Sequence, residues 1–144
     1  MENIYYFSHW LYKRNVPYIP RFLMNIMHVI YSCSIPYKAN IGKGLKLGHG
    51  GLGVVINANV LIGKNCHIGT CVTVGGTNKN PVVPTIGDNV VISTGAKVIG
   101  PITIGDNVVI GANAVVVSDI KSNSVVAGIP AKIIKENIDI NEYV

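Results

Sequence analysis

Ile86-Gly-Asp-Asn-Val-Val-Ile92 is followed, eighteen residues further on, by the identical stretch Ile104-Gly-Asp-Asn-Val-Val-Ile110. Inside and around these copies an aliphatic residue, usually followed by Gly, recurs at every sixth position. The series comprises Ile41, Leu47, Ile56, Ile62, Ile68, Val74, Ile86, Ile92, Val98, Ile104, Ile110 and Val116. A hexad of this kind is typical of one short strand and turn of a parallel β-helix, whose aliphatic residue points inward and stacks on the next coil. Gly and Asn supply the turn conformations that other residues adopt only with strain.

The period of six excludes the commoner alternatives. An amphipathic helix needs apolar residues at i, i+3, i+4 and i+7, and a half-buried strand alternates with period two. Three hexads per coil give a triangular prism with about five coils between Ile41 and Ala127, each advancing by about 4.8 Å. The sequence therefore predicts an all-β fold, a parallel β-helix of hexapeptide repeats with a short helical N-terminal segment.

Composition limits the possible partners. With 144 residues the chain is expected to be one compact unit, and only 13% of its residues are charged. The net charge of +5 favours anionic ligands. The Lys and Arg residues are scattered without an aromatic RNA-binding motif, so no nucleic-acid partner is expected. A thin prism leaves aliphatic surface uncovered, which predicts association through flat faces, and a homotrimer suits the triangular section.

The three cysteines predict a reducing environment. Cys33, Cys66 and Cys71 have no metal-ligand spacing, and the chain shows no signal peptide. An odd number of cysteines in such a chain predicts reduced thiols and a cytoplasmic protein. Cys66 and Cys71 fall within the repeat, where small packing residues are expected.

Three segments are expected along the chain. Residues 1–33 form a helical N-terminal cap, residues 34–127 the β-helix domain, and residues 128–144 a C-terminal extension that is a short helix or loose from Glu136. The apolar runs before residue 33 are too short to span a bilayer. Their Trp, Tyr, Lys and Arg residues also fit an interfacial anchor at the inner face of a membrane, so this alternative to a simple cap stays open.

Two interruptions of the repeat are candidate functional loops. Three extra residues bulge out within 48–53, and residues 77–84 leave the repeat as an excursion. Loops on a rigid scaffold commonly carry function. His49 lies in the first bulge between glycines, where a ligand can approach closely, and a neutral histidine is suited to accept a proton near pH 7. A solvated loop histidine is the alternative.

A family resemblance rests on five stretches in a fixed order. They are Ile41-Gly-Lys-Gly-Leu-Lys-Leu-Gly-His49, Gly53-Val-Val-Ile56, Val72-Thr-Val-Gly-Gly-Thr77, Pro84-Thr-Ile-Gly-Asp-Asn89 and Ala127-Gly-Ile-Pro-Ala131. Over residues 34–135 the chain resembles serine acetyltransferases and, equally, the bacterial sugar O-acetyltransferases of that superfamily. The resemblance implies a left-handed β-helix, a homotrimer, acetyl-CoA as the donor without a metal, and active sites between subunits.

The resemblance also implies roles for particular residues. His49 matches the catalytic general base, and the backbone N–H groups of Gly75 and Gly76 are the candidates for oxyanion stabilisation. The matches to the donor site are Gly76, Thr77 and Lys79 in a loop, Thr94 and Ala112 along the pantetheine arm, and Lys132 and Lys135 near the nucleotide phosphates. Ordinary turn packing and solvated lysines are the alternatives for these positions.

Departures from serine acetyltransferases bear on the acceptor. Where that family has two aspartates and a histidine, this chain has Ser34, Gly48 and Val83. Charged groups suit a zwitterionic amino acid, so the sequence favours a sugar or glycan hydroxyl, as in polysaccharide biosynthesis, with Ser34, Leu52 and Val83 as acceptor contacts. The alternatives are serine, as in cysteine biosynthesis, or a non-catalytic β-helix assembly module. A carbonic-anhydrase-like site needs three histidine ligands, and only His49 and His67 lie in the repeat.

Overall fold

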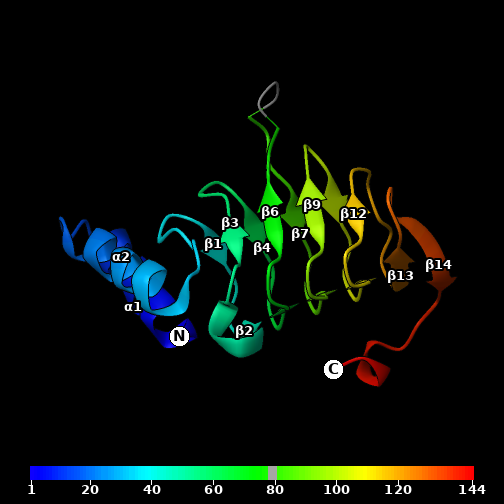
Figure 1. The fold of residues 1–144 in the computed structure, drawn as a ribbon, viewed down its shortest axis with the longest axis horizontal. Coiled ribbons are helices and arrows are strands. Elements are labelled where there is room, and N and C mark those ends of the chain that lie inside the picture. Colours follow the sequence, from blue (N-terminus) through cyan, green and yellow to red (C-terminus); the bar gives the residue numbers. More distant parts are fainter. Residues whose placement is uncertain (78–80) are drawn as a thin grey trace.

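The structure is a computed structural model that describes residues 1–77 and 81–144. Two helices precede a series of very short strands (Figure 1). The elements are α1 (Glu2–Lys13), α2 (Ile19–Tyr31), β1 (Asn40–Ile41), β2 (Lys46–Leu47), the 3₁₀ turn η1 (Gly48–Gly51), β3 (Val55–Ile56), β4 (Leu61–Ile62), β5 (His67–Ile68), β6 (Thr73–Gly75), β7 (Thr85–Ile86), β8 (Val91–Ile92), β9 (Lys97–Ile99), β10 (Thr103–Ile104), β11 (Val109–Ile110), β12 (Val115–Val116), β13 (Ser124–Ala127), β14 (Lys132–Glu136) and the 3₁₀ turn η2 (Ile140–Glu142).

The strands form three sheets that are the faces of a triangular prism. Sheet A contains β3, β6, β9 and β12, sheet B contains β1, β4, β7 and β10, and sheet C contains β2, β5, β8, β11 and β13 in parallel, extended by β14. Each coil visits the sheets in the order B, C, A. The predicted parallel β-helix is confirmed, although the sheets correspond to between four and five coils rather than five.

The two interruptions of the repeat make two of the coils longer than the regular eighteen residues. Ile41 lies beside Ile62, Ile62 beside Ile86, and Ile86 beside Ile104, so successive coils hold 21, 24 and 18 residues. The first coil is longer by the three residues of the bulge around η1, and the second by the segment between β6 and β7. Both insertions leave the scaffold at edges of the prism, because the register of the neighbouring strands is preserved.

The core is the stack of hexad aliphatic residues predicted from the sequence. All twelve residues of the series are buried, with at most 8% of the side chain exposed. Each such burial contributes about 1.5–3 kcal/mol. At one edge, asparagines with positive φ also stack, and their side-chain amides form a ladder. Asn89 Nδ2 donates to Asn107 Oδ1 at 3.0 Å, and Asn107 Nδ2 donates to Asn123 Oδ1 at 2.9 Å. This ladder explains why asparagine recurs with the repeat.

The N-terminal helices form a hairpin against the first coil (Figure 1, blue). The hydroxyl of the fully buried Tyr5 donates to the carbonyl of Ala39 at 2.7 Å, and the Tyr6 hydroxyl donates to the carbonyl of Gly42 at 2.6 Å. Burial raises the pKa of Tyr5, which keeps its hydroxyl protonated as a donor. Within the described ranges, neither helix is long and apolar enough to cross a membrane.

The C-terminal segment contains a strand that the sequence did not predict, followed after Glu136 by a short helical turn. The chain returns as strand β14, which pairs antiparallel with β13, and only η2 is a short helical turn. Sheet C would otherwise end on the unpaired edge of β13, and β14 satisfies its backbone groups. Lys132 and Lys135 therefore lie on the strand that ends sheet C.

Candidate active site

His49 has an unusual backbone conformation. It lies in η1, at the edge where sheet C passes into sheet A, and its φ and ψ of 48° and 43° place it in the left-handed region. Few non-glycine residues adopt this region, and histidine is one of those enriched there. Backbone strain of this kind is concentrated at functional sites. The conformation turns the chain away from the prism and leaves the His49 side chain exposed.

Neighbouring contacts fix the bulge that carries His49. A Cβ on Gly51, whose φ is +80°, would lie 2.7 Å from Met1 Cε, so the corner requires glycine. Glu2 Oε1 accepts a hydrogen bond from the backbone N–H of Leu47 at 2.9 Å, which ties the start of the bulge to α1. In the described part of the chain, the His49 imidazole has no hydrogen-bond partner. The backbone is thus held while the side chain remains available to a substrate.

A groove runs from the His49 bulge along the outer surface of sheet C. It has a volume of about 520 Å³, and its lining includes Gly48, Gly69 and Thr94. A Cβ on Gly69 would lie 2.5 Å from the backbone nitrogen of Thr94, so these turns stack at the closest approach that glycine allows. The groove therefore extends from Gly48, the residue before the predicted base, to the predicted donor-binding residue Thr94.

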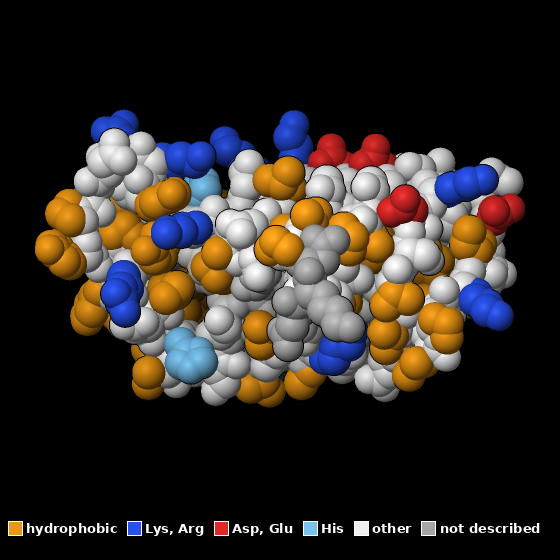
Figure 2. Space-filling view, turned by 90° about the horizontal axis from the view of Figure 1, so that it is seen from above, with side chains coloured by type: hydrophobic (Ala, Val, Ile, Leu, Met, Phe, Trp, Pro, Cys, Tyr) orange, Lys and Arg blue, Asp and Glu red, His pale blue; other side chains and the backbone are white. Residues whose placement is uncertain are grey.

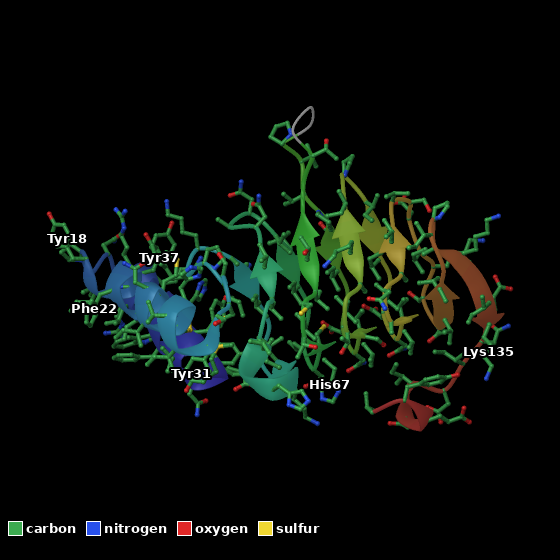
Figure 3. The ribbon with its side chains drawn as sticks, in the orientation of Figure 1. Tyr18, Phe22, Tyr31, Tyr37, His67 and Lys135 are labelled. Atoms are coloured by element: carbon green, nitrogen blue, oxygen red, sulfur yellow. The ribbon has the colours of Figure 1, made fainter. Side chains whose placement is uncertain are left out.

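The predicted pantetheine residues share an edge with His49. Thr94 lies between β8 and β9, and Ala112 lies between β11 and β12, so both occupy the sheet C to sheet A edge. The Thr94 hydroxyl lies 3.3 Å from the Thr70 hydroxyl of the preceding coil. Lys132 and Lys135 on β14 lie further along sheet C, and Figure 3 shows Lys135 at the far end of the prism. The predicted donor-binding residues therefore follow one another along sheet C and its edge with sheet A, starting from the bulge that contains His49.

The predicted oxyanion loop lies elsewhere. Gly75 is the last residue of β6 and Gly76 follows it, at the edge where sheet A passes into sheet B. Figure 1 shows this loop at the opposite side of the prism from η1. Gly75 is buried and its carbonyl accepts from the Gly100 N–H at 2.9 Å. Thr77 is exposed beside it, and Lys79 lies outside the described residues. A single chain does not bring this loop to His49.

The three predicted acceptor contacts are dispersed. Leu52 ends η1 next to His49 and is 51% exposed, which suits a contact in the bulge. Ser34 forms the first rung above β3, where its backbone N–H donates to Val54 and its carbonyl accepts from Ile56. Val83 is half-buried against the core near the other edge. Of the three, Leu52 is the one in the same loop as His49, which it follows by three residues.

Two features of this region were not predicted. His67, to which the sequence analysis gave no role, is on strand β5 directly opposite Lys46 of β2. Burial lowers the pKa of the His67 imidazole, and the positive charge of Lys46 lowers it further. The hexad register was the available signal, since the residue before an inward Ile68 must point outward. Cys71, expected to be a packing residue, is exposed at a turn with positive φ, whereas Cys66 is buried.

Comparison with known proteins identifies the repeat and the family. The family model described as bacterial transferase hexapeptide (six repeats) matches residues 84–118. The serine acetyltransferase of Helicobacter pylori strain J99 is 43% identical over 135 residues, which cover 92% of this chain and 78% of that protein. The chain belongs to the serine acetyltransferase family.

Other members of the serine acetyltransferase family are longer. The serine acetyltransferase of Synechococcus elongatus is 43% identical over 129 residues, which cover 88% of this chain and 52% of the relative. The chain thus spans about half the length of that relative. The serine acetyltransferase of Brucella abortus strain S19, solved in complex with coenzyme A, has a TM-score of 0.86 at 34% identity, covering 93% of this chain and 54% of that one. These structural neighbours are left-handed β-helices, and this chain has the same hand.

Proposed function

We propose that this chain transfers an acetyl group from acetyl-CoA to a hydroxyl group, with His49 as the general base. The observation that carries the proposal is the left-handed, exposed His49 in a fixed bulge at the end of the groove that passes Thr94. The coenzyme A complex of the Brucella abortus neighbour supports the choice of donor. The aligned positions of Thr94 and Ala112 on the same edge support a pantetheine arm that follows this edge.

In the proposed reaction a neutral His49 accepts the proton of the acceptor hydroxyl while its oxygen attacks the thioester carbonyl carbon. The carbon–sulfur bond then breaks, the acetyl group stays on the acceptor oxygen, and the thiolate of coenzyme A takes the proton from His49. General-base assistance of this kind contributes about 10²–10⁴ in rate. Backbone N–H groups at Gly75 and Gly76 would stabilise the oxyanion.

The separation of these groups supports a homotrimer. His49 and the loop around Gly76 lie on different edges of one prism, so a complete site needs the loop of a neighbouring copy. A heterologous contact between two different edges closes into a ring when the rotation between copies is threefold. Exposed aliphatic residues on the flat faces, such as Val55 on sheet A and Leu61 on sheet B, suit burial in such contacts.

Serine is the acceptor that the family supports, which corrects the preference for a sugar. The sugar preference rested on Ser34, Gly48 and Val83 in place of charged residues, and the relatives compared are serine acetyltransferases. A sugar hydroxyl remains a second candidate for one reason. No Asp or Glu lines the groove among the described residues, so none is placed there to pair with the ammonium of serine.

The acceptor proposal predicts a response to serine. Purified protein with acetyl-CoA should release free thiol faster when serine is added, and neutral sugars at equal concentration should leave the rate at its background. Thiol release followed across both acceptor classes is the measurement. A response to nucleotide-sugars or glycans without one to serine would contradict serine as the acceptor and support the second candidate. If no hydroxyl acceptor increases the rate of thiol release, the proposed acetyltransferase activity is contradicted.

We further propose that the N-terminal hairpin contacts an anionic membrane surface. α2 buries Met27 yet exposes Phe22, Val29 and Ile30, whose exposed fractions are 63%, 78% and 66%. Figure 3 shows Phe22 at the end of the molecule remote from the prism. A helix that is apolar on its outer face needs a partner. The exposed apolar face of α2, formed by Phe22, Val29 and Ile30, is therefore the candidate membrane contact.

Charge identifies an anionic surface as the fitting partner. Lys13, Arg14 and Arg21 lie on the hairpin, and Arg14 Cζ is 4.3 Å from the Trp10 ring centroid. In Figure 2, hydrophobic and basic side chains gather over this end, while the acidic ones lie over the rest of the prism. A second copy would bring the same positive charges, whereas anionic lipid headgroups attract them.

Vesicle sedimentation tests the membrane contact. The protein should sediment with vesicles of phosphatidylcholine and phosphatidylserine, remain in solution with phosphatidylcholine alone, and be released by high salt because surface charges are then screened. Val29→Ser should weaken sedimentation, and the matched change Val117→Ser, at an exposed valine that follows β12, should not. Equal binding of both variants would contradict the proposal. So would a larger assembly that Val29→Ser splits, since the apolar face would then join two copies.

A further inference from the structure

A lysine and a histidine are neighbours on the outer face of sheet C, beside the candidate active site. Lys46 on β2 and His67 on β5 are direct partners in the parallel register, and neighbouring strands are about 4.8 Å apart. The following residues, Leu47 and Ile68, are buried, so Lys46 and His67 point outward. The positive charge of Lys46 attracts an anion to this place, and the neighbouring imidazole of His67 can donate a ring N–H to it.

Two hollows meet at this pair. The groove of about 520 Å³ extends from Lys46 and His67 to Gly48 and Thr94. A second hollow of about 260 Å³ is lined by the same two residues, by asparagine side chains and by the C-terminal segment. Among the described residues, neither lining contains Asp or Glu. The pair therefore presents positive charge and hydrogen-bond donors to an open surface that leads to the His49 bulge. Figure 3 shows His67 on this surface.

The protein itself does not neutralise the pair. In the described ranges, neither side chain takes part in a hydrogen bond or an ion pair. The C-terminal segment is acidic, and its Ile140, Asn141 and Val144 line the second hollow. Asp139 Oδ1 accepts from the backbone N–H and the side-chain amide of Asn141, at 3.0 and 2.8 Å, and among the described residues no ion pair joins this segment to Lys46.

We propose that Lys46 and His67 bind a carboxylate group of the acceptor. The proposal rests on the proposed acetyl transfer and specifies the class of acceptor. A carboxylate accepts from several donors, and the Lys46 ammonium and a ring N–H of His67 supply two. His49 follows Lys46 by three residues, which limits their Cα separation to about 10 Å. An acceptor held at this pair can therefore present a nearby hydroxyl to His49.

This assignment divides the candidate acceptors by charge. Serine carries a carboxylate, and so does an acidic sugar, whereas a neutral sugar does not. Among the described residues, the groove lining contains no Asp or Glu that could pair with the ammonium of serine. The proposed site therefore recognises an acceptor by its hydroxyl and its carboxylate and does not require an amine. A hydroxy acid such as glycerate contains both groups and nothing else.

Kinetic comparison of matched acceptors tests the assignment. The wild-type protein should show a KM at least about tenfold lower for serine than for serinamide, because a charge-assisted hydrogen bond is lost with the carboxylate. Lys46→Met should remove this preference, while KM for acetyl-CoA stays within about twofold. Lys43→Met is the matched control, since Lys43 is exposed on a neighbouring turn and lines neither hollow. His67→Gln should reduce the preference in part.

A binding measurement separates this proposal from the proposed function. Calorimetric titration with glycerate should show binding to wild type and to Lys43→Met, and at least about tenfold weaker binding to Lys46→Met. Glycerol should bind none of them detectably. If glycerate binds in this way and no acceptor is acetylated, the anion site stands and the proposed reaction fails. Lys46→Gln replaces Lys46→Met if the methionine variant does not fold.

Three outcomes would overturn the assignment. The first is a wild-type protein that does not distinguish serine from serinamide. The second is an unchanged preference in Lys46→Met. The third is an unchanged preference combined with faster hydrogen exchange at residues 138–144, because Lys46 would then serve only to hold the C-terminal segment.

Discussion

Replacing His49 with alanine is expected to lower the rate of acetyl transfer by at least about a hundredfold, because the acceptor hydroxyl loses its general base. The His49 side chain is exposed and has no hydrogen-bond partner in the described ranges. Its removal should therefore leave the fold intact, and the melting temperature should change little. Initial rates of thiol release, measured at saturating acetyl-CoA, give the size of the effect.

The control for this variant is His28→Ala. His28 is also an exposed histidine, but it lies on α2, where its Nδ1 is 3.2 Å from the Cys33 carbonyl. The control should retain most of the activity, and both variants should bind acetyl-CoA as wild type does, because the proposed donor contacts lie on later coils. Comparable loss in the two variants, or full activity in His49→Ala, would show that the base lies elsewhere.

Mixed trimers provide the second large effect. His49→Ala and Gly76→Trp each disable one half of the proposed site, on different edges of the prism. Each pure variant should fall to about a hundredth of wild-type activity or less. Co-expressed with different tags and purified through both tags, they should recover about a third of it. Every heterologous ring that contains both variants has three interfaces, and one of them joins an intact His49 edge to an intact loop.

Light scattering supports the interpretation of the mixing experiment. The mass should be about three times the 15.4 kDa of the chain. Recovery of activity in the mixture together with this mass indicates a site between subunits. A mixture as inactive as its parents would place the reacting groups within one chain. That result would conflict with the separate edges on which His49 and Gly76 lie.

The inward stack could be predicted from the sequence because it depends on one strict rule. Each coil must place an aliphatic residue such as Ile86 above its counterpart Ile104, and a slip of one residue would turn a core residue to solvent. Every hexad therefore shows this requirement as an aliphatic residue at the same position. The hand of the coil has no such signature, because the same hexads stack in either direction, and it was inferred only from the resemblance to a family.

The arrangement of the candidate site depends on the geometry of the edges. The bulge at His49 and the loop near Gly76 are both visible as interruptions of the repeat, but the sequence does not state that they leave different edges. That follows once β2 is assigned to sheet C and β6 to sheet A. Strand β14 was missed because Lys132–Glu136 has no hexad signal and forms by pairing with the free edge of β13.

The acceptor shows how local residues and overall similarity can point in different directions. Ser34, Gly48 and Val83 lack the charges of the family and suggested a neutral sugar. Overall identity to serine acetyltransferases favours serine, and Lys46 and His67 add positive charge that the motif comparison had not considered. These two residues precede the inward residues of ordinary hexads. The repeat pattern alone therefore does not distinguish Lys46 and His67 from other outward-facing residues, although both line the groove.

The reaction product is the most direct test of the proposed acetyl transfer. The protein is incubated with acetyl-CoA and serine, and the amino acid, the free thiol and the intact protein are followed together by mass spectrometry. We predict one O-acetylated serine for each coenzyme A released, no acetyl group on the protein, and neither product with His49→Ala. Thiol release without an acetylated hydroxyl, or an acetyl group retained on the protein, would contradict direct transfer assisted by His49.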